Sequence, residues 1–404
     1  MDLALQNNIE IKIKTLEIKR TQQSQNSILN RMLPSVNLYG EQSYNFGSTI
    51  DPSTNGRVSS NIQNDNFFLN AKTNLIDFSA FANAKKDKIS IELAKAEKEV
   101  VENEYKLQLL ESYYQALYTQ ELLKIQKEQL QQAAFNLDRI TKEVAIGSKA
   151  QSDLYDIQLS YSEEENSYIA TQQVYGIQKT QLFQLMNATD IETDTVVLEI
   201  YFNENTPNSV ENINDNPKIK RAEFQYQASL KSIAAARATN LPVLSAYYGY
   251  STFYYRNIKN ANGFTDSFSN QLSDNKSQQL GMQLAIPIFN GFRNNMRIKN
   301  KKIESEQAKL VVEQEKQELD KQLVLEEQNK ENCLQLQQQL NNRKKYAKAS
   351  FTTMQAKFAS GRVEAIVFSA VKNQFLKAEY DGLKNNLQLQ FIDLKIRLLK
   401  NNAL

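Results

Sequence analysis

Four segments of the chain alternate between apolar and polar residues with a period of two. In the first, Val36, Leu38, Tyr44 and Phe46 fall on one face and Asn37, Glu41, Ser43 and Asn45 on the other. Similar segments run from Phe67 to Leu75, from Val243 to Phe253 and from Leu280 to Ile286. This alternation predicts β-strands with one apolar face and one polar face. The polar face of the second strand carries Asn70, Lys72 and Asn74.

Polar loops separate the two strands of each pair. Residues 47–66 and 256–277 are crowded with Ser, Asn, Asp and Gly. Both are longer than the two to five residues of a tight hairpin, so the sequence predicts exposed, irregular connections.

Long helices are predicted on either side of the strand pairs. From about Ala80 to Ala145 the chain holds neither proline nor glycine. At 1.5 Å per residue this predicts about 100 Å of continuous helix. Apolar residues recur every seven positions, which is typical of helices packed side by side as in a coiled coil. They form two rows, Leu93, Val100, Leu107 and Tyr114 on one and Leu109, Ala116, Leu123, Leu130, Leu137 and Val144 on the other.

The same order of elements occurs twice. Leu33-Pro34 precedes the first strand pair and Leu241-Pro242 the second, 208 residues later, and Gly147 and Gly361 lie 214 residues apart. Each repeat, residues 1–186 and 218–404, contains a first helix, a strand pair and a long helical hairpin. The expected helices are Leu3 to Asn30, Ala80 to Ala145 and Gly147 to Met186, then Lys218 to Thr239, Asn294 to Ser360 and Val363 to Lys400. Residues 187–217 lose helical periodicity and predict a connector with some local structure, including a candidate strand from Val196 to Phe202.

Composition excludes several classes of site. Lysine plus arginine number 48 against 46 acidic residues, a net charge of +2 that gives no general electrostatic case for nucleic acid. Histidine is absent, which excludes His-based triads and His–metal sites, and the single Cys333 excludes an internal disulfide framework. No segment approaches the ~20 apolar residues of a membrane-spanning helix. The sequence predicts neither a metal site nor a cofactor.

The predicted strands are about eleven residues long, the length that crosses an outer membrane in a tilted barrel. Four strands cannot close a barrel, and open strand edges are not tolerated in hydrocarbon. If these strands enter a membrane, the chain must therefore oligomerise. Two copies would supply eight strands, whose interior side chains fill, and three would supply twelve, which leaves a passage.

This combination of repeated elements and motifs resembles the TolC-like outer-membrane factors of tripartite efflux and type I secretion systems. The resemblance rests on the duplicated order, the Leu-Pro pairs, Phe289-Asn290-Gly291 after the last strand, and the two glycines of the hairpin tips. It implies a mainly α fold with a β-barrel portion, in which a homotrimer forms a twelve-stranded barrel in outer-membrane lipid above a periplasmic tunnel of helices. Residues 187–217 and the C-terminal end would form an equatorial girdle. The implied partners are a periplasmic adaptor protein and an inner-membrane pump.

The resemblance also assigns roles near the tips. Gly147, Ser148 and Gly361 would face the adaptor, at the closed end of the tunnel. Acidic residues six and nine positions after the tip glycine are typical of the constriction, and Asp153 and Asp156 occupy these positions in the first repeat. The corresponding positions of the second repeat hold Val367 and Ala370, while Phe358 replaces the expected tyrosine and Arg362 stands one position from the expected arginine. A ring of carboxylates that favours cations and a gate closed by Phe358, Val367 and neighbouring apolar groups are both open hypotheses.

Two other functions compete with a passive exit duct. The chain could be a coiled-coil scaffold with a soluble strand head, although such a head would not need four membrane-length strands with apolar faces. A carboxylate-based hydrolase is a third reading, but nothing in the sequence indicates the rigid pocket that it would need. The chain opens directly into its first helix at Met1-Asp2-Leu3, so we expect a shortened start or a mature form of an exported protein.

Overall fold

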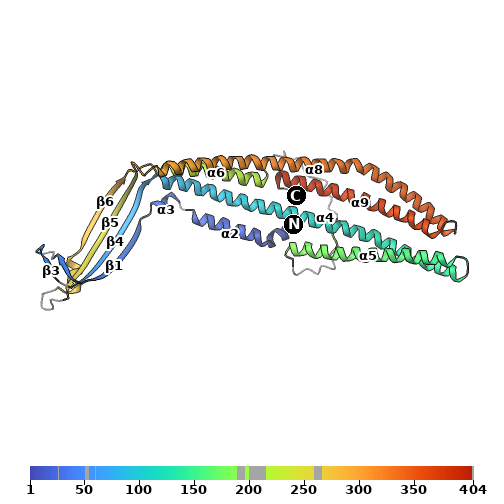
Figure 1. Ribbon diagram of the computed structural model, residues 1–404, viewed down its shortest axis with the longest axis horizontal. Helices are drawn as coiled ribbons and strands as arrows, with labels where there is room; N and C mark the ends of the chain where they lie inside the picture. Colours follow the sequence, from blue (N-terminus) through green and yellow to red (C-terminus); the bar gives the residue numbers. More distant parts are fainter. Residues whose placement is uncertain are drawn as a thin grey trace. The chain divides into compact units, whose positions relative to one another are not determined.

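Long helices and one four-stranded sheet make up the chain in the computed structural model, which describes residues 1–25, 27–50, 54–59, 61–188, 196–199, 215–258 and 266–402 (Figure 1). The first repeat contains α1 (Asp2–Asn7), α2 (Ile9–Ser24), α3 (Ile28–Met32), β1 (Ser35–Asn45), β2 (Ser48–Ile50), β3 (Arg57–Ser59), β4 (Ile62–Asp77), α4 (Phe78–Ala145) and α5 (Gln151–Leu185). The second contains α6 (Pro217–Ala238), β5 (Val243–Asn257), α7 (Phe268–Asp274), β6 (Ser277–Ala285), α8 (Arg293–Ala359) and α9 (Ala365–Asn401). The predicted duplication of helix, strand pair and helical hairpin is therefore present.

Two compact units divide these elements between them. The helical unit consists of Met1–Lys19, Leu93–Glu223 and Leu310–Leu404, and the sheet unit consists of Arg20–Glu92 and Phe224–Lys309. Each unit draws on both sequence repeats. The division at residues 186 and 218 describes the duplication of the sequence, and the compact units follow a different division.

The sheet unit is built on an antiparallel sheet of order β1-β4-β5-β6. β1 pairs with β4 from Ser35↔Lys72 to Asn45↔Ile62, and β5 pairs with β6 from Val243↔Ala285 to Ser251↔Ser277. The central pair, β4 with β5, joins the two repeats and is interrupted by one bulge between Asn74 and Ile76. The period-two prediction is confirmed, and β4 extends beyond it at both ends.

The connections between strands contain structure that the sequence analysis did not predict. In the connection between β1 and β4, β2 and β3 form a small antiparallel hairpin. In the connection between β5 and β6, the hydroxyl of Ser267 accepts a hydrogen bond from the backbone N–H of Asn270 and caps α7. Phe268 of α7 then packs against the rings of Phe67 and Tyr254. The prediction of irregular loops was wrong for these segments, because backbone pairing forms the β2–β3 hairpin and because capping and aromatic contacts order α7.

The first helix is also interrupted, contrary to the prediction of one helix from Leu3 to Asn30. α1 ends at Asn7, and the side-chain oxygen of Asn8 accepts a hydrogen bond from the N–H of Ile11 at 3.0 Å, which starts a new helix. Ser27 caps α3 in the same way through the N–H of Asn30 at 3.1 Å. Of the candidate strand from Val196 to Phe202, residues 196–199 are not in a strand, and residues 200–202 lie outside the described residues.

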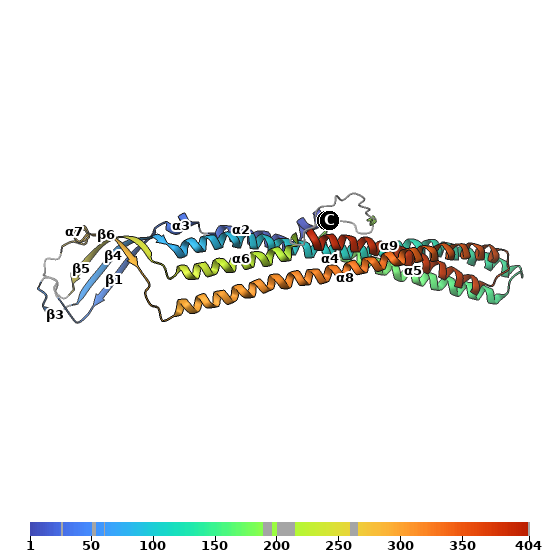
Figure 2. The ribbon, with the colours of Figure 1, turned by 90° about the horizontal axis from the view of Figure 1, so that it is seen from above.

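Heptad packing holds the helical unit together. Val100, Leu109, Tyr114 and Ala116 from the two predicted rows of α4 are buried, and the rest of both rows is at least half-buried. Figure 1 and Figure 2 together show α5 running back beside α4 and α9 running back beside α8. None of the helices among the described residues combines the length and the apolar character that crossing a membrane would need.

Candidate functional site

The four-stranded sheet exposes a continuous apolar face. Leu38 on β1 is 75% exposed and Leu280 on β6 is 82% exposed. The register places Leu38 beside Leu69 and Leu280 beside Tyr248, so one face collects Val36, Leu38, Leu69, Ala71, Ala246, Tyr248, Tyr250, Leu280, Met282 and Leu284. Leaving this much apolar surface in water is unfavourable, and such patches mark interaction or membrane surfaces.

The opposite face of the sheet is mainly polar. Asn37 lies beside Asn70, Asn70 beside Gly249, and Gly249 beside Gln279 in one row across all four strands. Lys72 lies on the same face beside Tyr247. The predicted separation of polar and apolar residues is therefore a property of the whole sheet.

Both outer edges of the sheet are unpaired among the described strands. β1 pairs with β4 alone and β6 pairs with β5 alone. An edge strand presents unpaired N–H and C=O groups that template pairing with another chain. The sheet thus has two edges available for further strands.

The tips of the two helical hairpins have the same geometry. Gly147 and Gly361 adopt φ values of +76° and +72°. The N–H of each glycine bonds a carbonyl three residues earlier, and the N–H of the next residue, Ser148 or Arg362, bonds a carbonyl five residues earlier at 2.9 Å. This double hydrogen-bond pattern ends an α-helix with a left-handed residue, which glycine adopts without a Cβ clash. The turn predicted at each glycine is confirmed.

The residues predicted for the constriction occupy different environments. Asp153 lies in the first turn of α5, where its carboxylate is 3.8 Å from the Lys149 ammonium. Asp156 and Arg362 are exposed, and Val367 is exposed on the first turn of α9. Phe358, in contrast, is 3% exposed and packs within the hairpins. The roles of these five residues at a gate remain predictions.

An aromatic stack fills the space around Phe358. Its ring lies 4.4 Å from Phe368, and Phe351 continues the stack to Phe368 and Phe375. The Arg139 guanidinium also lies over the ring of Phe358, 4.7 Å from the ring centroid. Beside it is a hollow of about 410 Å³ lined mainly by polar side chains, among them Gln131, Asn136 and Gln355.

A buried ion pair joins the two hairpins. The ammonium of Lys372 on α9 lies 2.6 and 2.7 Å from the carboxylate oxygens of Glu164 on α5. The side chains are only 4% and 15% exposed. Burial raises the pKa of Glu164, and the charge and hydrogen bonds of Lys372 oppose that rise. Nothing in the sequence indicated this pair, because the two residues are 208 positions apart.

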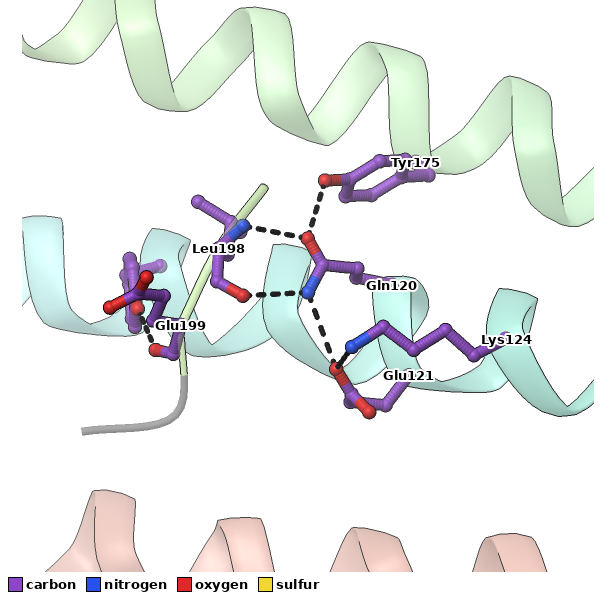
Figure 3. A network of polar contacts seen from close by, with 7 residues as sticks. Gln120, Glu121, Lys124, Tyr175, Leu198 and Glu199 are labelled. Atoms are coloured by element: carbon purple, nitrogen blue, oxygen red, sulfur yellow. Dashed lines mark hydrogen bonds and ion pairs between the residues drawn. The ribbon is translucent and has the colours of Figure 1, made fainter. Parts of the chain in front are cut away.

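A second polar network fastens the connector to the first hairpin (Figure 3). The side-chain oxygen of Gln120 on α4 accepts hydrogen bonds from the backbone N–H of Leu198 and from the hydroxyl of Tyr175 on α5, both at 2.8 Å. Its amide nitrogen donates to the carbonyl of Leu198 at 2.8 Å and to the carboxylate of Glu121 at 3.3 Å. Gln120 thus satisfies both backbone groups of Leu198, which leaves neither unpaired in a buried position.

The C-terminal end of α9 is capped by amide side chains from other elements. Asn103 of α4 donates to the carbonyl of Leu398 at 2.8 Å, and Asn216 donates to the carbonyl of Leu399 at 2.7 Å. Near this end, burial is the main cause that raises the pKa of Tyr114 to about 12, with Tyr113 and Asp393 adding to it. The C-terminal end and the connector are therefore both bound to α4.

The residues that the structure describes hold no group of three or more histidine, cysteine, aspartate or glutamate side chains placed to bind a metal ion.

Comparison with known proteins decides the family. The sequence profile described as outer membrane efflux protein matches residues 1–188 and 209–400. The chain belongs to the outer membrane efflux protein family. No curated protein matches the chain in a sequence search.

Solved structures of outer-membrane proteins share the fold of this efflux protein. VceC from Vibrio cholerae matches with a TM-score of 0.80 at 12% identity, over 99% of this chain and 94% of that chain. The Campylobacter jejuni CmeC channel matches with a TM-score of 0.80 at 12% identity, over 99% and 84%. The open state of the Neisseria gonorrhoeae MtrE channel matches with a TM-score of 0.77 at 15% identity, over 100% and 88%.

Family membership defines the general role of the efflux protein. It lies in the outer membrane and serves there as an exit duct. It is a passive channel and not an enzyme. The predicted resemblance and localisation are confirmed.

Proposed function

We propose that three copies of this efflux protein close a twelve-stranded barrel and a helical tunnel. The assembly would form the exit duct of a tripartite efflux or type I secretion system, together with a periplasmic adaptor and an inner-membrane pump. The observation that carries this proposal is a four-stranded sheet with one mainly apolar face, whose two outer edges are unpaired among the described strands.

The direction of the strands supports closure into a ring. Each neighbour in the order β1-β4-β5-β6 is antiparallel, so β1 and β6 run in opposite directions. β6 of one copy can therefore pair with β1 of the next and keep every pair antiparallel. Such a head-to-tail contact produces a closed ring when the rotation between copies closes.

The number of copies follows from the interior of the barrel. Eight strands from two copies enclose only enough space for side chains, whereas twelve from three copies enclose a wider lumen. The apolar face would contact lipid, and the polar face with Asn70, Lys72 and Gln279 would contact water. Three copies of a 46.4 kDa chain amount to about 139 kDa.

Native mass and cross-linking test this assembly. Protein extracted from membranes in mild detergent should form a particle of three chains. In a Cys333→Ala background, Asn37→Cys on β1 combined in turn with Gln279→Cys or Gln283→Cys on β6 should link different copies into covalent trimers. The matched control is Asn70→Cys with Gly249→Cys, which are paired within one chain and should cross-link without joining copies. A particle of one or two chains would refute the barrel.

The tips support a role in gating and adaptor contact. Gly147, Ser148, Gly361 and Arg362 lie at the exposed ends of the hairpins. Three copies would bring Asp153 and Asp156 together as up to six carboxylates, which would favour cations. Opening would separate packed helices at the tips, as helices slide between discrete arrangements.

Conductance measurements test the acidic ring. Asp153→Asn with Asp156→Asn should lower the preference for cations in reconstituted channels. Asp138→Asn is the control, since this exposed carboxylate pairs with Lys142 on α4. Unchanged cation selectivity and closed-state leak in the double variant would eliminate the acidic ring and favour an apolar gate that includes Val367.

A further inference from the structure

The polar face of the sheet contains a hollow centred on Gly249. Its volume is about 530 Å³, and its lining includes Phe68, Tyr247, Phe253 and Glu41. All of these residues belong to the sheet unit and to the face that carries Asn70 and Gln279.

Small side chains form the floor of this hollow. Along β5 the residues facing this side are Tyr247, Gly249, Ser251 and Phe253, so a glycine and a serine lie between two aromatic rings. Ser277 lies beside Ser251 on β6. A Cβ built on Gly249 would meet no atom within 4 Å. The depression therefore exists because side chains are missing from its centre.

Aromatic rings form its walls. Phe68 is 40% exposed and Phe253 is 45% exposed, although both lie on the mainly polar face. Phe68 is held in place by stacking on Tyr39, with ring centroids 4.8 Å apart. Rigid, exposed rings around a concave surface are typical of ligand sites that recognise flat apolar molecules.

One carboxylate supplies the charge in the lining of the hollow. Among its described lining residues Glu41 alone carries a formal charge, and it lies in the same row as Asn66 and Phe253. Lys72 lies at the other end of the hollow, beside Tyr247, and is six positions from Asn66 along β4, or about 20 Å from the row of Glu41 at 3.4 Å per residue. A cation in the hollow would thus contact both a carboxylate and aromatic faces.

We propose that this hollow is a transit subsite that binds planar aromatic cations as they pass through the barrel. The proposal rests on the proposed function, because only in a closed ring does this face line a passage. A volume of about 530 Å³ is within the range of sites for drug-sized molecules. Weak binding at such a site would concentrate the cargo without preventing its release, as conduction requires.

Ethidium binding to the trimer in zwitterionic lipid nanodiscs tests the proposal by fluorescence anisotropy. Gly249→Val fills the hollow with a residue that strands favour and leaves every charge and ring in place. We expect it to weaken ethidium binding at least about tenfold. Glu41→Gln removes the carboxylate and should weaken binding by about threefold, as expected for an exposed cation contact.

Matched variants and probes serve as controls. Tyr44→Ala removes an exposed aromatic ring from the opposite face, and Asp274→Asn removes an exposed carboxylate of α7. Neither should change ethidium binding. Fluorescein, an aromatic anion, should bind the wild type at least about tenfold more weakly than ethidium, and empty nanodiscs measure partition into lipid.

Two results would overturn the subsite. One is equal ethidium binding by the wild type and Gly249→Val. The other is a Glu41→Gln variant that binds ethidium and fluorescein as the wild type does. Native mass and ion conductance separate this failure from that of the proposed function. A conducting trimer that binds no ethidium would overturn the subsite alone, whereas a particle without three chains would overturn the duct as well.

Discussion

Replacing Lys372 with methionine should loosen the contact between α5 and α9. In the wild type its ammonium group lies 2.6 Å from the Glu164 carboxylate, and the two side chains are 4% and 15% exposed. Methionine keeps most of the volume of the lysine stem and removes the charge. Glu164 would then remain in a largely buried position without its ionic partner.

The size of the effect follows from burial and charge. At 2.6 Å and an effective dielectric constant of about 20, the two charges attract each other by about 6 kcal/mol. The cost of removing both ions from water offsets much of this attraction, so the intact pair contributes little net stability. Removing one partner lowers stability by about 3 to 5 kcal/mol, because the other ion stays buried. For Lys372→Met we expect a loss of stability of about 3 kcal/mol. Glu164 has a raised pKa, so it can take up a proton, which limits the penalty of leaving its charge buried.

Hydrogen exchange of the reconstituted protein measures this loss locally. A decrease of about 3 kcal/mol in the free energy of opening should accelerate amide exchange in α5 and α9 around the pair by about 100-fold. The double variant Lys372→Met with Glu164→Leu removes both charges and should recover most of the protection. Lys142→Met, which breaks an exposed pair with Asp138, is the control and should have no effect.

Two outcomes would refute this reasoning. Unchanged exchange in Lys372→Met would mean that the pair does not hold the hairpins together. Equal loss of protection in the single and double variants would mean that packing of the lysine stem, and not an isolated buried carboxylate, is the cause.

Three further predictions concern the connector, the tips and the tyrosines. Gln120→Leu leaves both backbone groups of Leu198 without their partner, so limited proteolysis between α5 and α6 should accelerate by about tenfold. Gly147→Ala and Gly361→Ala force a Cβ into the left-handed region, and each should cost about 1 to 2 kcal/mol, seen as a lower Tm. The pKa of Tyr114 is raised from 10.0 to about 12, so the stability of the protein should hold below pH 10 and fall as the pH rises toward 12. Tyr114→Phe should reduce this loss of stability, measured as the decrease of Tm with pH.

Each of these predictions has a matched control. Gln126→Leu removes an exposed hydrogen bond to Ser167 and should leave proteolysis unchanged. Gly176→Ala lies within α5, where alanine favours the helix, so Tm should stay the same or rise. Tyr155→Phe changes an exposed tyrosine and should not alter the alkaline transition. Faster proteolysis of Gln126→Leu, a lower Tm of Gly176→Ala or a changed alkaline transition of Tyr155→Phe would each contradict the corresponding explanation.

Local chemistry in the sequence determined much of the fold. Alternation with a period of two located the strands because neighbouring side chains of a strand point to opposite faces. The seven-residue spacing of apolar side chains in α4 located the buried face of a helix that packs against others. Gly147 and Gly361 predicted the hairpin tips because glycine adopts the left-handed conformation without strain. In these cases the information lies within a few residues of the chain.

The interruptions of the first helix have signals in the sequence, but they were not predicted. Asn8 and Ser27 have the side chains that cap helix starts, but the polar stretch around them resembles the exposed face of a continuous helix. The connector was predicted correctly to lack helix at residues 196–199, and its attachment through Gln120 had no signal. A glutamine on a long polar helix is in most cases solvated, so the sequence around Gln120 does not indicate that its side chain is buried and binds the connector.

Only the tertiary structure decided which distant residues meet. The pairing of β4 with β5 joins the two repeats and leaves β1 and β6 as the outer strands of the described sheet, a choice that strand patterns alone do not specify. In the helical unit, packing brings Lys372 to Glu164 across 208 positions, and in the sheet unit strand pairing surrounds Gly249 with Phe68 and Phe253. The sequence determined the elements and their apolar faces because these depend on local sterics and periodicity. Their partners depend on how those faces are buried together, which is a property of the whole chain.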